Sequence, residues 1–101
     1  MNPAQLQKMM KQAQQLQTQM QNAQGELEKK EFSITTGGDA IVLVMTGDKR
    51  IVSLNIKPEV IDPDDKDMLE DMIKSAINTL SDQIDKETET TMGQYTQGLP
   101  F

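Results

Sequence analysis

The first 28 residues carry an apolar repeat that is too long for one small globular domain to bury. Neither glycine nor proline occurs between Ala4 and Gln24, and the apolar residues are spaced alternately three and four apart. This spacing is typical of the a and d positions of a coiled-coil-like helix. These residues are Leu6, Met9, Ala13, Leu16, Met20, Ala23 and Leu27. With Asn2 as N-cap and Pro3 in the first turn, the pattern predicts a helix from Pro3 to about Glu28.

The predicted helix is longer than the globular body that a chain of this size can form. At 1.5 Å per residue it spans roughly 40 Å, whereas a 100-residue globule has a radius of gyration of about 13 Å. Part of its apolar seam must therefore contact another chain or remain exposed, and we predict a homodimer. The residues expected at the dimer interface are Leu6, Met9, Ala13, Leu16 and Met20.

Turn signals after the helix predict three strands and a second helix. The segments Gly37-Gly38-Asp39 and Gly47-Asp48-Lys49 suit tight hairpin turns, and Val52, Leu54 and Ile56 alternate with other residues in the last strand. Asp62 and Pro63 are typical of a helix start. The chain is therefore expected to be one α+β domain over residues 1–101, with a helical arm (1–30), a three-stranded antiparallel meander (31–57), a second helix (62–91) and a tail (93–101).

Composition excludes most catalytic chemistry. The chain has no Cys and no His, so thiolate chemistry, the commonest general base and the usual zinc ligands are missing. The carboxylates between Asp62 and Asp71 fail the spacing of a calcium-binding loop and are read as an acidic helix start. We predict no catalytic site, metal or cofactor, and no small-molecule substrate.

Hydropathy argues against membrane insertion. The longest apolar run, from Ala40 to Met45, is six residues long, whereas a bilayer span needs about 20. The glutamine-rich start of the chain also lacks the apolar stretch of a signal peptide. We therefore expect a cytoplasmic protein with no membrane partner.

Charge divides the chain into two unequal parts. Residues 1–57 hold seven cations and five acids, whereas residues 58–101 hold three cations and eleven acids. Only the first helix and the hairpins could therefore receive a polyanion such as nucleic acid. Few aromatic residues are present for stacking on single-stranded bases, which favours contacts with the duplex backbone. The candidate DNA-binding residues are Lys8, Lys11, Lys29 and Lys30, with Lys49 and Arg50 as secondary contacts.

Several short segments, spread over nearly the whole chain, resemble the YbaB/EbfC family of bacterial nucleoid-associated proteins. They are Met9 to Gln14, Gly37-Gly38, Ile51-Val52 with Ile56 before Pro58, Asp62 to Asp71 (DPDDKDMLED), Met92-Gly93 and Gly98 to Phe101. The resemblance implies an α+β homodimer whose long helices project like the arms of tweezers. It also implies binding to double-stranded DNA with weak sequence selectivity, at the nucleoid.

A second interpretation of the same features is a protein-interaction scaffold. The exposed seam of the first helix is rich in Met, a residue that adapts to varied protein partners. In that case DNA binding would be incidental. An enzyme ranks third, because only carboxylates, lysines and hydroxyls remain available for catalysis.

Overall fold

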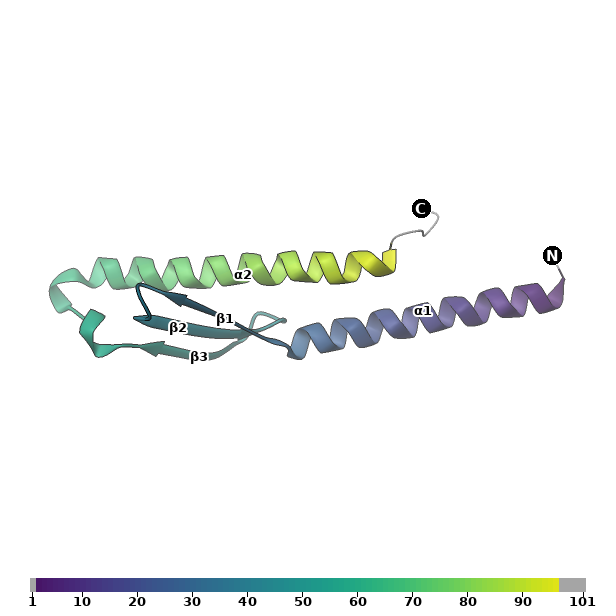
Figure 1. Cartoon of the computed structure of the whole chain (residues 1–101), viewed down its shortest axis with the longest axis horizontal. Coiled ribbons are helices and arrows are strands. Elements are labelled where there is room, and N and C mark those ends of the chain that lie inside the picture. Colours follow the sequence, from purple (N-terminus) through teal and green to yellow (C-terminus); the bar gives the residue numbers. More distant parts are fainter. Residues whose placement is uncertain (1, 97–101) are drawn as a thin grey trace.

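The computed structural model describes residues 2–96 and has the α-β-β-β-α order that the sequence predicts (Figure 1). Its three strands form one antiparallel sheet in the order β1-β2-β3. Two short 3-10 turns, η1 and η2, connect the sheet to the last helix. The bounds are α1 Pro3–Lys29, β1 Glu31–Thr36, β2 Ile41–Thr46, β3 Ile51–Ile56, η1 Pro58–Val60, η2 Pro63–Asp65 and α2 Lys66–Thr96.

Helix α1 begins with a reciprocal cap at Asn2. Its side-chain oxygen accepts a hydrogen bond from the Gln5 backbone N–H at 2.8 Å, and the Gln5 side chain accepts one from the Asn2 N–H at 3.4 Å. Pro3 occupies the first helical position, where the missing N–H has no helical partner to lose. The helix continues through Gly25 and ends at Lys29, one residue beyond the predicted end.

Replacing the cap should loosen the beginning of α1. Asn2→Ala removes the acceptor for the Gln5 N–H and is expected to cost about 1 kcal/mol of local helix stability. Amide hydrogen exchange in the first two turns should therefore accelerate by about fivefold. Gln12→Ala, a substitution in the middle of the same helix, should leave exchange in these turns unchanged. Equal exchange in both variants would show that the cap does not hold the helix start.

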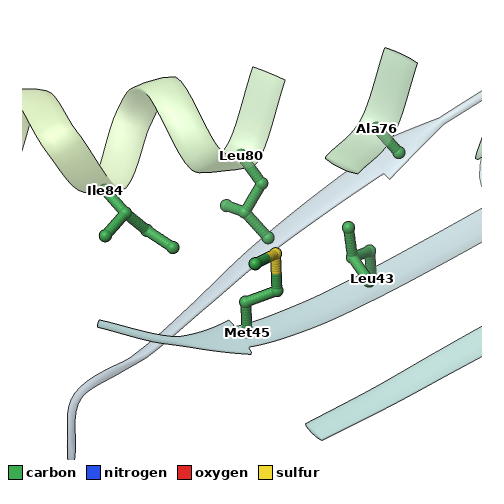
Figure 2. Packing of buried hydrophobic residues seen from close by; sticks show 5 residues of the cluster. All are labelled: Leu43, Met45, Ala76, Leu80 and Ile84. Carbon is green, nitrogen blue, oxygen red and sulfur yellow. The ribbon is translucent and has the colours of Figure 1, made fainter. Parts of the chain in front are cut away.

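The core lies between the central strand β2 and one face of α2. Leu43 and Met45 of β2 point toward Ala76, Leu80 and Ile84 of α2 (Figure 2). Alternate residues of a strand face the same side, which explains why Ile41 is buried as well. Phe32 and Ile34 of β1, together with Ile77 of α2, pack against this cluster. The core therefore involves β1, β2 and α2.

Both ends of α2 differ from the predicted helix over residues 62–91. The Asp62 side chain caps the turn η2 by accepting the Asp64 N–H at 2.9 Å, so the α-helix itself starts only at Lys66. The helix then continues through Gly93 to Thr96, and the prediction that Gly93 starts a tail is wrong. Helix–helix contact between α1 and α2 explains the extension, because packing overrides weak local propensity. Residues 97–101 of the predicted tail lie outside the described residues.

The molecule is elongated. Its Cα radius of gyration is 20.8 Å and its principal extents are 76 × 22 × 16 Å. Figure 1 shows α1 extending away from the sheet and beyond the end of α2. We use the name arm for the outer part of α1, residues 3–20, which is shorter than the helical arm (1–30) predicted from the sequence. The prediction that the helix is too long to be covered by its own domain is confirmed.

Candidate nucleic-acid interface

The arm presents its apolar seam without a covering element. Leu27 is the one buried residue of α1. The seam residues Leu6 and Met9 expose 51 and 53 % of their surface, and Met10 beside the seam exposes 56 %. Towards the other end of α1, Ala23 and Leu27 line a small cleft with Thr91 and Tyr95 of α2. Helix α2 therefore covers the last part of the seam. The predicted dimer-interface residues Leu6, Met9, Ala13, Leu16 and Met20 lie before this part, and none of them is fully buried.

The surface of the arm outside the seam is polar and carries two of the predicted DNA-binding residues. Lys8 and Lys11 are exposed and three residues apart, which places them on one side of a helix. At 100° per residue, Lys11 lies roughly half a turn from the seam. A shallow hollow on this side is lined by Lys11, Gln14, Gln15, Thr18 and Gln19. Ammonium and amide groups on one helix side can donate hydrogen bonds to phosphate oxygens.

The other four predicted cations gather where α1 meets the sheet. The turn between β2 and β3 is held there because the Gly47 N–H donates to the Lys30 carbonyl oxygen at 3.0 Å. A Cβ atom on Gly47 would lie 1.7 Å from the Leu27 carbonyl oxygen, so only glycine permits this approach. Figure 1 shows the turn beside the end of α1. Lys29 and Lys30 of the helix end thus lie near the turn that carries Lys49 and Arg50.

Three of these four cations are paired with carboxylates. The Lys30 Nζ atom lies 2.9 Å from Glu87 Oε2 of α2 and 5.1 Å from the centre of the Phe32 ring. Lys49 Nζ lies 2.7 Å from Asp85 Oδ1, also on α2. Arg50 Nε is 3.6 Å from Asp48 Oδ2, and the arginine side chain is 86 % exposed. All three pairs are partly or largely exposed, so each contributes at most about 1 kcal/mol.

Within the described part of the chain, Lys8, Lys11 and Lys29 make no ion pair. The sequence therefore identified a set of cations that the structure divides into paired and unpaired members. The ion pairs made by Asp85 and Glu87 were not predicted from the sequence. Their partners lie far away in the sequence, and no local pattern indicates such contacts. These ion pairs reduce the positive field at the base of α1. The positive field of the arm cations is not reduced in this way.

The acidic start of α2 lies at the far end of the molecule from the arm. Figure 1 shows the beginning of α2 at one extreme of the long axis and the beginning of α1 at the other. Among residues 2–96, no group of three or more carboxylates is placed to hold a metal ion. Separation along the long axis leaves the arm able to approach a polyanion without bringing these carboxylates close to it.

No helix in the described part of the chain is both long and apolar enough to cross a membrane.

Comparisons with known proteins identify the family. Residues 1–99 match the YbaB/EbfC DNA-binding family. A nucleoid-associated protein of Clostridium kluyveri is 50 % identical over 91 residues, covering 90 % of this chain and 80 % of that protein. A nucleoid-associated protein of Lactococcus lactis subsp. cremoris is 46 % identical over 96 residues, covering 95 % of this chain and 97 % of that protein.

A solved structure shares the fold. An uncharacterised protein from Helicobacter pylori superimposes with a TM-score of 0.67 at 16 % sequence identity, over 89 % of this chain and 91 % of that one. The family match covers nearly the whole sequence. The identity of about half the residues to two nucleoid-associated proteins agrees with it. This chain therefore belongs to the YbaB/EbfC DNA-binding family.

Proposed function

We propose that this protein is a non-enzymatic homodimer that binds double-stranded DNA through α1, with weak sequence selectivity, at the nucleoid. The observation that carries the proposal is the position of Lys8 and Lys11. These two cations have no ion pair within residues 2–96 and lie on the arm, at the end of the molecule remote from the acidic start of α2 (Figure 1). Membership of a DNA-binding family supports DNA as the polyanion that the arm binds.

Weak selectivity follows from the kinds of side chain on the arm. Lysine ammonium groups contact phosphates, which carry no sequence information. The only arginine of the chain, Arg50, lies at the β2–β3 turn and not on the arm. Since bidentate recognition of guanine is most often made by arginine, the arm is better suited to backbone contacts than to base reading. Lys29, Lys30, Lys49 and Arg50 would supply further phosphate contacts near the base of α1.

The exposed surface supports the homodimer. A compact monomer of 11.3 kDa exposes about 5,700 Å², whereas this chain exposes 7634 Å². The excess is about 1,900 Å² per chain, more than the roughly 800 Å² that each partner buries in a standard interface. The proposed contact is the uncovered seam of α1, from Leu6 to Met20. Pairing of two arms there would duplicate Lys8 and Lys11.

Fluorescence anisotropy on duplex DNA tests the proposal. If a dimer contacts phosphates with about four cations, the logarithm of the affinity should fall against the logarithm of the salt concentration with a slope near −3.6. Two unrelated duplex sequences should give similar affinities at each salt concentration. Protein mass, measured in the same buffer, should correspond to a dimer. A slope near zero would contradict phosphate binding, and a monomer's mass would contradict the dimer.

Releasing a paired lysine should strengthen DNA binding. Glu87→Gln removes the carboxylate that holds Lys30 and lowers the negative charge near the base of α1. We expect a twofold to fivefold gain in duplex affinity, about what one exposed ion pair is worth. Glu89→Gln makes the same charge change on α2 at a residue with no ion pair in the described part of the chain. An equal gain in both variants would mean that net charge, and not Lys30, is responsible.

A protein-interaction scaffold is the second candidate function. The exposure of Leu6, Met9 and Met10 favours it, because adaptable apolar side chains on an uncovered helix suit a protein partner. In that case a partner would remain bound after nuclease treatment and duplex binding would be absent at physiological salt.

A further inference from the structure

Two glutamines continue the line of the arm lysines along α1. At about 100° per residue, Gln15 and Gln19 fall within roughly a quarter of a turn of Lys8 and Lys11. All four side chains are exposed, and both glutamines line the shallow hollow that also includes Lys11. We use the name glutamine pair for Gln15 and Gln19. The pair therefore shares one side of the helix with the two cations proposed to bind phosphates.

The side-chain amides of the glutamine pair are not engaged by the protein. Among residues 2–96, neither of them makes a hydrogen bond. The hydroxyl of Thr18 in the same hollow instead donates to the Gln14 carbonyl oxygen at 3.0 Å. The sequence has no acidic residue before Glu26, so no carboxylate of the arm repels a polyanion there. The pair therefore offers unused hydrogen-bond donors and acceptors next to two cations.

The shape of the arm suits the major groove of duplex DNA. Figure 1 shows α1 extending beyond the sheet and beyond the end of α2, so this part of the helix is accessible. An α-helix with its side chains is about 10–12 Å across, and the major groove is about 12 Å wide. The minor groove, at about 6 Å, is too narrow for a helix. Pairing of two arms through the seam would leave Gln15 accessible, because it lies outside the seam.

We infer that the glutamine pair reads adenine in the major groove, which gives this protein a small preference for A·T base pairs. A glutamine amide both donates and accepts, and it matches the N6 amino donor and the N7 acceptor of adenine. The arm has no arginine for guanine and no Asp or Glu for cytosine. The inference rests on the proposed function, because phosphate contacts of the arm lysines must first bring α1 to the duplex.

The expected preference is small enough to agree with weak sequence selectivity. A few-fold difference is far below the factor of about a thousand or more that separates specific from non-specific binding in site-specific proteins. Contacts between lysines and phosphates remain the main source of affinity. Two duplexes with equal shares of adenine would therefore be bound almost equally. A duplex of A·T pairs would be favoured over one of G·C pairs.

Removing the N7 acceptor of adenine tests the inference without changing the base pairs. 7-Deazaadenine still pairs with thymine and keeps its N6 amino group, but a C–H group replaces N7. We expect wild-type protein to bind a duplex that contains 7-deazaadenine about fivefold more weakly than the same duplex with adenine. This ratio is at the low end of what one bidentate base contact contributes. Fluorescence anisotropy at one salt concentration measures both affinities.

Alanine variants assign the ratio to the glutamine pair. Gln15→Ala with Gln19→Ala should bind both duplexes equally, while its salt dependence keeps the wild-type slope because both lysines remain. Gln17→Ala with Gln21→Ala is the matched control, since both positions are exposed and have the same spacing. They lie about 200° further around the helix, so this variant should keep the fivefold ratio. Alanine favours helix, and circular dichroism should show full helix content in both variants.

The outcomes separate this inference from the proposed function. Equal binding of the two duplexes by wild type would overturn the inference, whereas a salt slope near −3.6 in the same protein would still support phosphate contacts. A ratio that persists in Gln15→Ala with Gln19→Ala would also overturn it, as would loss of the ratio in the control variant. Absence of duplex binding in wild type would contradict the proposed function and the inference together.

Discussion

Reversing both arm charges should nearly abolish DNA binding. In Lys8→Glu with Lys11→Glu, a dimer loses all four cations of its two arms. If four phosphate contacts account for the slope of −3.6, counterion release at about 0.1 M salt contributes a factor on the order of a thousand to the affinity. We therefore expect about a thousandfold weaker binding on any duplex sequence, measured by fluorescence anisotropy. Both residues are exposed and unpaired within residues 2–96, so the helix content should not change.

A matched pair of charge reversals on α2 provides the control. Lys66→Glu with Lys74→Glu changes the net charge by the same amount. Lys66 pairs with Asp67 and Glu70 at the acidic start of α2, at the end of the molecule away from the arm. This variant should retain duplex affinity within a few-fold of wild type. Equal losses in both double variants would show that overall charge governs binding and that the arm has no special role.

The second large effect is expected at Gly47. In Gly47→Ala the new Cβ would lie 1.7 Å from the Leu27 carbonyl oxygen and 2.6 Å from the Leu27 carbonyl carbon. Both atoms belong to the backbone of α1, so the clash cannot be relieved by rotating a side chain. The turn must move away and strain its hydrogen bond to the Lys30 carbonyl. We expect a loss of at least about 2 kcal/mol in the free energy of unfolding, or roughly 10 °C in Tm.

Gly25, within α1, provides a control for which the opposite change in stability is expected. A Cβ at Gly25 meets no atom within 4 Å, and alanine is favoured over glycine in a helix interior by about 1 kcal/mol. Gly25→Ala should therefore raise Tm by a few degrees, as followed by circular dichroism. A Gly47→Ala protein that melts at the wild-type temperature would contradict the close contact between the β2–β3 turn and α1.

The order of elements could be predicted because its signals are local. The heptad spacing of Leu6, Met9 and the residues that follow, the Pro3 start and the glycine turns each act within a few residues. The continuation of α2 through Gly93 could not be predicted, because it depends on α1 lying beside α2. The exposure of Val52 could not be predicted from the sequence either. Its alternation with Leu54 and Ile56 suggests a buried face, whereas α2 covers only the neighbouring strands.

The candidate site was accessible from the sequence only in part. The division of charge between the two halves of the chain is a property of composition, and it correctly places the cations on α1 and the hairpin. Which of them are held by carboxylates depends on the packing of α2, which brings Asp85 to Lys49 and Glu87 to Lys30. The individual DNA contacts and the seam contact stay predictions.

Site-specific cross-linking tests the central claim, that α1 contacts DNA. Because the chain has no cysteine, a single introduced cysteine carrying a photo-cross-linker reports on one position only. Gln12→Cys places the probe on the arm, and Asp71→Cys places it near the start of α2, and both positions are exposed. We expect a cross-link to duplex DNA from position 12 and none from position 71. Cross-linking from position 71 with none from position 12 would contradict this claim.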